Sequence, residues 1–198
     1  MEKDNIARGA TPERLGAFSD GVLAIIITIM VLDLKVPHES GAVALWGIWP
    51  TFFSYALSYL FVGVVWINHH HLLRHLARVN LAVIWANLCL LFTVSLIPFF
   101  TAYMAEKKDS FATALYSGVF LLVTVTFIIF EGVIARQPSM HDSPERGRMR
   151  NWVALLGYIV AIPAAYIHPA AALAIIVGIS ALYFVPDTAK RSTKLSPK

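Results

Sequence analysis

The chain has few charged residues and almost no cysteine. Of its 198 residues, 14% are Asp, Glu, Lys or Arg, and the single cysteine, Cys89, stands inside an apolar run. One cysteine excludes an intrachain disulfide, so the redox compartment cannot be inferred from it. The chain also lacks a phosphate-binding glycine loop and a serine or cysteine nucleophile beside a recognisable base. These absences count against a soluble globular domain and against an enzyme.

Long apolar runs dominate what is present. Hydrophobic residues make up 58% of the chain and the mean hydropathy is +0.66, more than a soluble domain of this length carries. Roughly 20 apolar residues cross a bilayer, and the chain has six candidate spans, at about 15–35, 46–68, 80–104, 111–135, 151–167 and 170–186. The predicted fold is an all-α polytopic membrane protein with six transmembrane helices, a single domain over residues 1–187 with a basic tail at 188–198.

Basic residues are shared unequally between the two sides of the predicted bundle. They gather before the first span, in the second and fourth loops and in the tail, whereas the opposite side carries only Lys35, Lys107 and Lys108. Because loops rich in Lys and Arg stay in the cytoplasm, we predict a multi-pass protein of the cell membrane with both termini cytoplasmic. The first span is too long for a signal-peptide core, and no small-residue cleavage site follows it. The pI near 9.3 reflects this topology, so no nucleic-acid partner is predicted.

The first span joins charged residues directly to an apolar run. Its helix is predicted to begin near Pro12, where Thr11 supplies an N-cap, and Pro37 ends it. Charges at the mouth of a transmembrane helix are costly, so Arg14 and Asp20 mark either a function or a fixed packing network. Two interpretations stay open for this pair, a structural ion pair or hydrogen-bond network and a proton or ion pathway.

Apolar side chains and a single hydroxyl form a stripe along one face of this helix. At 100° per residue, five side chains lie within about 60° of Ile25, namely Phe18, Thr28, Ile29, Leu32 and Val36. Asp20 lies about 140° from Ile25 and is expected to point toward other helices. Packing or lipid contact is the ordinary explanation of such a stripe, and a membrane threonine commonly bonds its own backbone, so periodicity alone does not indicate a pore.

A second polar cluster ends the second span, on the same side of the membrane as Arg14. Its members are Trp66, Asn68, His69, His70, His71, Arg74 and His75. His71 and His75 have the i, i+4 spacing of shared metal ligands, but no cysteine or acidic cluster completes a set, and no metal site is predicted. Titration of His69, His70 and His71 near neutral pH is an open source of pH sensitivity.

Two further function classes stay open, a secondary transporter and a non-conducting membrane assembly protein. A transporter needs inverted repeats or broken helices around a midplane site. Pro98 and Pro163 stand where helices would break, although such kinks are more often architectural. Glu131, in the fourth span, lacks a partner for an acid–base pair, so an enzyme is not predicted.

The pattern Arg14-x-x-x-Phe18-Ser19-Asp20, followed by a small residue and an Ile-rich helix, resembles the first-helix signature of the transmembrane protein 175 family. That family consists of potassium channels, and its prokaryotic members carry one six-helix repeat and form tetramers. The resemblance extends over essentially the whole chain. It implies a homotetramer in the lipid bilayer with the first helices around a central pore, K⁺ and other monovalent cations as permeant ions, and no bound cofactor.

Carried over by position, the resemblance implies roles for single residues of the first helix. Ile25 would form a hydrophobic constriction, Thr28 a hydroxyl layer and Leu32 a further apolar layer. Asp33 would concentrate cations at the outer mouth, with a solvated helix end as its alternative. Since the chain has no Thr-Val-Gly-Tyr-Gly filter, gating by dewetting and a modest preference for K⁺ over Na⁺ are expected.

The resemblance also implies that the signature anchors the pore helix rather than conducting. Tryptophan and polar side chains of neighbouring helices would bond to it. The residues implied in this anchoring network are Arg14, Phe18, Ser19, Asp20, Trp66, Asn68 and His70. The individual pairs stay open at this point.

Overall fold

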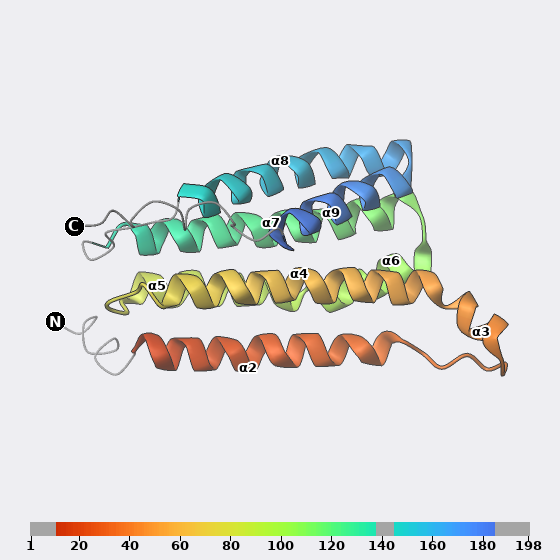
Figure 1. Cartoon of the computed structure of the whole chain (residues 1–198), viewed down its shortest axis with the longest axis horizontal. Coiled ribbons are helices and arrows are strands. Elements are labelled where there is room, and N and C mark those ends of the chain that lie inside the picture. Colours follow the sequence, from red (N-terminus) through yellow and green to blue (C-terminus); the bar gives the residue numbers. More distant parts are fainter. Residues whose placement is uncertain (1–10, 138–144, 185–198) are drawn as a thin grey trace, which may run out of the picture.

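The chain forms a bundle of helices in the computed structural model, which describes residues 11–137 and 145–184 (Figure 1). The predicted basic tail at 188–198 lies outside the described residues. The helices are α2 (Pro12–Met30), η1 (Val31–Asp33), α3 (Ala42–Gly47), α4 (Trp49–Leu73), α5 (Leu81–Ser95), α6 (Ile97–Lys107), α7 (Ser110–Ala135), α8 (Glu145–Ile167) and α9 (Pro169–Phe184).

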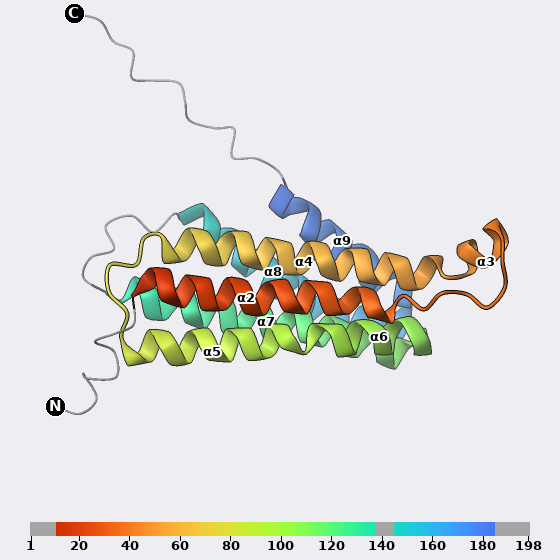
Figure 2. The same ribbon diagram turned by 90° about the horizontal axis from the view of Figure 1, so that it is seen from below.

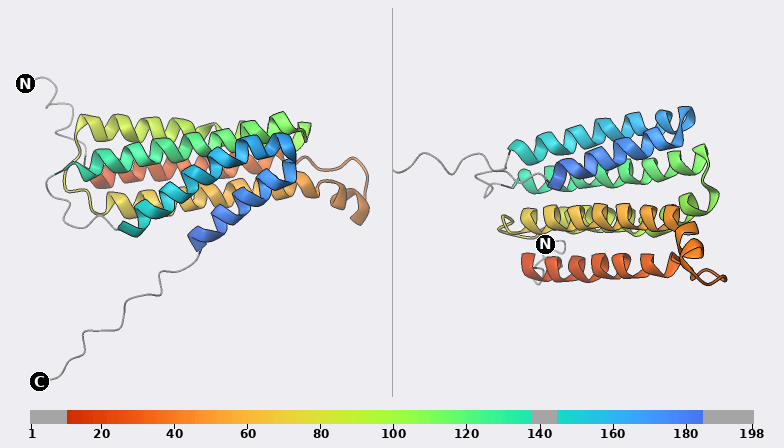
Figure 3. Two further views of the ribbon diagram at one scale, coloured as in Figure 1. Left: turned by 90° about the horizontal axis from the view of Figure 1, so that it is seen from above. Right: turned by 45° about the vertical axis from the view of Figure 1, so that its right-hand side comes forward.

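The helix α2 lies along one side of this bundle. It packs against α4, α5 and α6, whereas α7, α8 and α9 form the opposite side (Figure 1). Figure 2 shows α2 between α4 and the α5–α6 pair, with nothing in front of it. Both views in Figure 3 place the α8–α9 hairpin on the α7 side. The helix α2 therefore lies at the edge of the bundle that one chain forms, not at its centre.

Five segments are long and apolar enough to cross a membrane. They are Pro12–Asp33, Trp49–Leu73, Leu81–Lys107, Ser110–Ala135 and Met149–Ile167, which match the first five predicted spans. The sixth predicted span corresponds to α9, whose 16 residues reach only about 24 Å. In Figure 1, α9 stops well short of the end at which α7 finishes. Five candidate spans are thus found in the described chain, and a sixth crossing stays a prediction.

Local sequence signals explain where these helices start. Thr11 has extended backbone angles and its side chain accepts a hydrogen bond from Arg14 N, with Pro12 at the first helical position, as predicted. Pro98 accompanies a break in the third span, where α5 ends and α6 begins after one intervening residue. Pro163 lies inside α8 without ending it. Both spans continue past their proline.

A small polar cluster ties together three helices in the middle of the bundle. Ser58 of α4 lies 2.7 Å from the Thr101 hydroxyl of α6 and 2.8 Å from the Tyr116 hydroxyl of α7. Around it, Phe61 stacks on Phe120 with ring centroids 3.9 Å apart. Hydrogen bonds between polar side chains hold membrane helices together where apolar burial gives little driving force. The bonds of Ser58 hold together α4, α6 and α7, and α2 packs against two of these helices, α4 and α6.

The two ends of the bundle differ in charge, as the loops predicted. The end at which α2 begins also holds the last turns of α4 and α7 and the first turn of α5 (Figure 1); we call it the Arg14 end. Arginines of the described chain gather there, among them Arg14, Arg74, Arg78, Arg136 and Arg150. Lys35, Lys107 and Lys108 lie at the opposite, Asp33 end.

Candidate functional site

The predicted apolar stripe forms the uncovered face of α2. Ile25 is 62% exposed and Leu32 is 74% exposed, whereas Leu23 and Met30 on the opposite face are 1% exposed. Phe18, Thr28 and Ile29 belong to the uncovered face as well. Since the bundle core takes up one face of α2, the stripe is free to line something outside the single chain.

Thr28 carries the hydroxyl group of this stripe. Its Oγ1 donates to the backbone oxygen of Ala24 or Ile25, at 3.0 and 2.9 Å. The proton is therefore directed into the helix, while the oxygen lone pairs face outward. Such a hydroxyl is able to offer an oxygen to a cation, but it has no proton left to donate to an anion.

Asp20 points away from the stripe and toward α4. Trp66 Nε1 donates to Asp20 Oδ1 over 2.8 Å. This bond joins the signature aspartate of α2 to one of the three side chains anticipated as its partners. The bond links α2 to α4 on a side of α2 that the stripe does not occupy.

Ser19 joins a fully buried hydrogen-bond chain across three helices. Asn87 of α5 donates through Nδ2 to Ser19 Oγ over 3.0 Å, and its Oδ1 lies 2.7 Å from His69 Nε2 of α4. Ser19 Oγ in turn donates to Leu15 O over 2.9 Å. Ser19 and Asn87 have no exposed surface and His69 has 1%. The chain therefore links α2 to α4 and α5 at one depth.

Sequence reasoning named only part of this network. Asn68 donates to Val64 O of its own helix, and His70 lies beside the ring of Trp66, 6.0 Å between centroids. Neither is the partner that Ser19 uses. The signal for the missing member was a lone asparagine, Asn87, inside the third apolar run, since a polar side chain at that depth needs a partner.

A crevice of about 420 Å³ opens between α2 and α4 at the Arg14 end. Glu13, Asp20, His70 and Arg74 line it together with Gly16. Carboxylates, a histidine and an arginine give this crevice a mixed charge, so it suits water and mobile ions. It lies at the base of α2, beside the start of the stripe.

No metal centre is found among the described residues, where no group of three His, Cys, Asp or Glu side chains is placed to share an ion. The rings of His71 and His75 are 5.2 Å apart. His75 Nδ1, however, bonds to the backbone oxygen of His71 over 2.9 Å. That bond uses one ring nitrogen, and the pair lacks further ligands.

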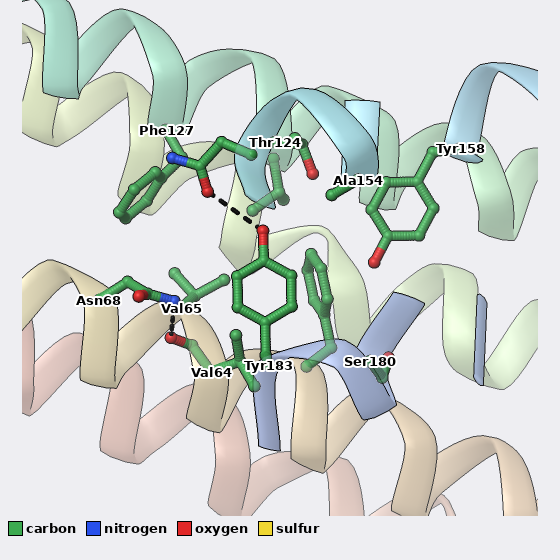
Figure 4. Close-up of a pocket in the computed structure, with 12 residues that line it drawn as sticks. Val64, Val65, Asn68, Thr124, Phe127, Ala154, Tyr158, Ser180 and Tyr183 are labelled. Atoms are coloured by element: carbon green, nitrogen blue, oxygen red, sulfur yellow. Dashed lines mark hydrogen bonds between the residues drawn. The ribbon is translucent and has the colours of Figure 1, made fainter. Parts of the chain in front are cut away.

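A second cavity, of about 30 Å³, lies between α4, α7, α8 and α9 (Figure 4). Asn151 crosses its edge, accepting from the Tyr183 hydroxyl over 3.1 Å and donating to Glu131 over 2.8 Å. This volume holds about two water molecules. Glu131 thus bonds to an amide, which does not titrate, and not to a second acid or base.

Asp33 lies at the far end of the stripe, in η1, and is exposed. A surface hollow of about 280 Å³ beside it is also lined by Lys35 and Glu106. The mixture of signs leaves the predicted cation-concentrating role of Asp33 as a prediction.

Comparison with known proteins identifies relatives that match most of the chain. The sequence profile described as "Endosomal/lysosomal potassium channel TMEM175" matches residues 14–98. A potassium channel of Chryseobacterium sp. is 36% identical over 89% of this chain and 94% of its own length. One from Streptomyces collinus is 33% identical over 86% of this chain and 90% of its own.

The fold has a solved counterpart as well. The crystal structure of a TMEM175 homologue from Chamaesiphon minutus, described as a lysosomal potassium-selective channel homologue, superimposes with a TM-score of 0.76 and 28% identity. The match covers 87% of this chain and 95% of that one. Sequence and fold therefore each match relatives over most of the chain.

Proposed function

Because the chain belongs to the TMEM175 family of potassium channels, we propose that it is a potassium-permeable cation channel in which four copies place α2 around a central pore. The relatives found are ion channels and not enzymes. The observation that carries the proposal is the uncovered face of α2. A membrane-length helix at the margin of the bundle leaves Ile25, Thr28 and Leu32 exposed.

The two flanks of this face support a ring. In a ring of four helices, each helix meets its neighbours about 45° to either side of the direction to the axis. With Ile25 toward the axis, Gly21 lies about 40° to one side and Ile29 about 40° to the other. A Cβ at Gly21 would meet nothing within 4 Å, so packing inside the chain does not demand glycine there. The glycine leaves room on this flank for a neighbouring copy of α2 to approach closely at the depth of Gly21.

The pore chemistry follows from the order of side chains along α2. Four Ile25 side chains would form an apolar constriction that conducts only when it is hydrated. One turn further, four Thr28 hydroxyls would offer oxygen lone pairs to a partly hydrated cation. Hydroxyls replace few of the waters of a K⁺ ion, so the preference for K⁺ over Na⁺ would be modest.

The proposal includes the membrane topology. Six crossings in the cell membrane would put both termini in the cytoplasm, and the grouping of the described arginines at the Arg14 end supports that orientation. The residues 1–187 would form one transmembrane domain. The crevice between α2 and α4 would then open to the cytoplasm.

Planar-bilayer recording of the purified protein tests the function directly. With opposed potassium and sodium gradients, we expect unitary currents that reverse toward the potassium equilibrium potential. Slow, saturable and coupled flux without unitary currents would support a secondary transporter instead. A protein that conducts nothing under these gradients would support a non-conducting assembly protein.

Thr28→Val is expected to bring the permeability ratio of K⁺ to Na⁺ close to one while the current persists. Valine has nearly the shape of threonine, so the substitution removes the hydroxyl layer and leaves the width of the pore. Reversal potentials under bi-ionic conditions measure the ratio. Thr124→Val is the control, because this α7 hydroxyl also bonds only its own helix, at Phe120 O, yet lies off the pore. An unaltered ratio in Thr28→Val would remove the hydroxyl layer from the proposal.

A further inference from the structure

A short apolar helix projects from the Asp33 end of the bundle. The helix α3 has six residues, Ala42–Gly47, none of them charged and none buried. Val43 is 88% exposed, Leu45 62% and Trp46 75%. Figures 1 and 2 both show α3 farther along the bundle than the ends of α6 and α8. Contact between apolar surface and water is unfavourable, so we expect something outside the single chain to cover this helix.

The rings of α3 and of the start of α4 form one stack. The ring centroids of Trp46 and Trp49 are 5.8 Å apart with the planes 9° from parallel, and those of Trp49 and Phe52 are 6.1 Å apart. The first distance limits the difference in depth between the two indoles to 5.8 Å. We call the exposed side chains of Val43, Leu45, Trp46 and Trp49 the α3 surface.

The tryptophans of the chain lie at two levels of the bundle. Trp46 and Trp49 lie at the Asp33 end, whereas Trp66 on α4, Trp85 on α5 and Trp152 on α8 lie nearer the Arg14 end. Each of the five is at least 42% exposed. Trp66 follows Trp49 by 17 residues of the same helix, which separates the two levels by about 26 Å.

The separation increases to about 33 Å when it is measured to Trp85. The bond between His69 and Asn87 places α4 and α5 at one height, and these two helices run antiparallel. Trp66 lies three residues before His69 and Trp85 two residues before Asn87, so the two steps lead in opposite directions. The two levels thus bracket the thickness of a bilayer's hydrocarbon, about 30 Å. Since tryptophan is enriched at both membrane interfaces, we infer that each level marks one interface.

Charged side chains place the interface at the same level. The bond between Ser58 and Thr101 fixes the height of α4 relative to α6. Trp49 lies nine residues before Ser58 and Lys107 six residues after Thr101, both toward the Asp33 end, so Lys107 is about 5 Å deeper than Trp49. Lys107 Nζ lies 2.9 Å from Glu106 Oε1, and both side chains are exposed. Exposed charges require water or headgroups, so the level of Trp49 lies within the headgroup layer and not within the hydrocarbon.

Neighbouring copies offer little that could cover α3. Copies related by rotation about an axis along the membrane normal keep every residue at a constant depth. Within the described chain, the helices α6 and α8 stop short of α3 (Figures 1 and 2). A bilayer interface, by contrast, accepts an indole with its ring against acyl chains and its N–H toward water.

We propose that α3 is an interfacial anchor, whose surface lies in the headgroup layer of the leaflet at the Asp33 end. The partner is a phospholipid surface of any net charge, because no Asp, Glu, Lys or Arg stands between residues 40 and 55. The residues 34–41 join α3 to η1, so the anchor ties the Asp33 end of α2 to the bilayer. The inference rests on the membrane embedding of the chain and not on fourfold assembly or conduction.

Spin labelling in liposomes tests the anchor. In a Cys89→Ser background, a nitroxide on Val43→Cys reports collisions with oxygen, which concentrates in lipid, and with a water-soluble nickel chelate. Leu122→Cys, at an exposed position in the middle of α7, is the lipid reference, and Glu39→Cys, at an exposed position before α3, is the water reference. The ratio of oxygen to nickel collisions for Val43→Cys is expected to lie between the two references. It is expected to be equal with and without phosphatidylglycerol in phosphatidylcholine liposomes.

Each other outcome overturns the anchor. A Val43→Cys label as accessible to nickel as the water reference would place α3 in water. A label that neither reagent reaches would show that protein covers α3, as in a contact with a second copy. A ratio that depends on phosphatidylglycerol would contradict a surface without charge. Because the readout needs no current, it stays separate from the outcome of the bilayer recordings.

The tie to α2 is tested by releasing the anchor. Leu45→Ser combined with Trp46→Ser is expected to shift the Val43→Cys label to the water reference. A label on Lys35→Cys, between η1 and α3, is expected to gain mobility in the same variant. Trp152→Ser is the matched control, because it removes a tryptophan that is 50% exposed at the other level, and both labels are expected to stay unaltered in it. An unaltered Val43→Cys label in the double variant would overturn the anchor, and an unaltered Lys35→Cys label would overturn the tie.

Discussion

Replacing Ile25 by alanine is expected to raise the unitary potassium current about tenfold, the effect of lowering a barrier by about 1.4 kcal/mol. Ile25 is 62% exposed on the uncovered face of α2, so shortening it should disturb packing inside the chain little. In the proposed assembly the substitution replaces four isoleucine side chains, all at the same depth in the pore, by smaller ones. A wider constriction stays hydrated more of the time, and the barrier to ion passage falls.

The comparison variant is Ile129→Ala on α7, an isoleucine of similar exposure, 55%. It removes the same atoms from a face directed away from α2, and its unitary current is expected to equal that of the unaltered protein. Both proteins are recorded in the same lipid and potassium concentration. A current in Ile25→Ala indistinguishable from this control would refute the assignment of the constriction, although other residues of the stripe would remain candidates.

Asn87→Leu is expected to lower the free energy of unfolding by about 2–4 kcal/mol, because it leaves two buried polar groups without their partner. Asn87 is fully buried and contacts both Ser19 and His69. Leucine has the same branching of side-chain heavy atoms as asparagine, so the substitution removes the hydrogen bonds without opening a cavity. Since the network holds α2 to α4 and α5, we expect the tetramer to loosen together with the fold.

Thermal melting in detergent, with the fraction of assembled protein read at each temperature, measures the effect. Ser95→Ala on α5 serves as the control, because this exposed hydroxyl bonds only to Phe92 O of its own helix. Its melting temperature is expected to stay within experimental error. An Asn87→Leu protein as stable as the control would show that the network is dispensable for α2.

Periodicity and local signals predicted much of the fold from the sequence. Thr11 and Pro12 marked the start of α2 because capping depends on neighbours within one turn. The two faces of α2 followed from 100° steps, which hold wherever a helix is regular. Apolar length placed five spans within a few residues. All of these signals are local.

The pairs between helices could not be predicted in the same way. Which polar group meets Ser19 depends on how α4 and α5 pack, and the resemblance implied Asn68 and His70 without His69. A shift of one residue turns a side chain by 100°. His69 therefore points into the core while His70 is exposed. Likewise, the apolar run after Pro169 predicted a full span at 170–186, whereas α9 as described has 16 residues, Pro169–Phe184.

The marginal position of α2 has a genetic consequence. If each copy supplies one helix to the wall of the pore, every channel depends on all of its subunits at once. With equal amounts of altered and unaltered chains mixing at random, roughly one assembly in sixteen would contain four unaltered copies. Substitutions on the uncovered face of α2 should therefore behave as dominant traits in a cell. Those that only prevent folding should remove chains from the pool and behave as recessive ones.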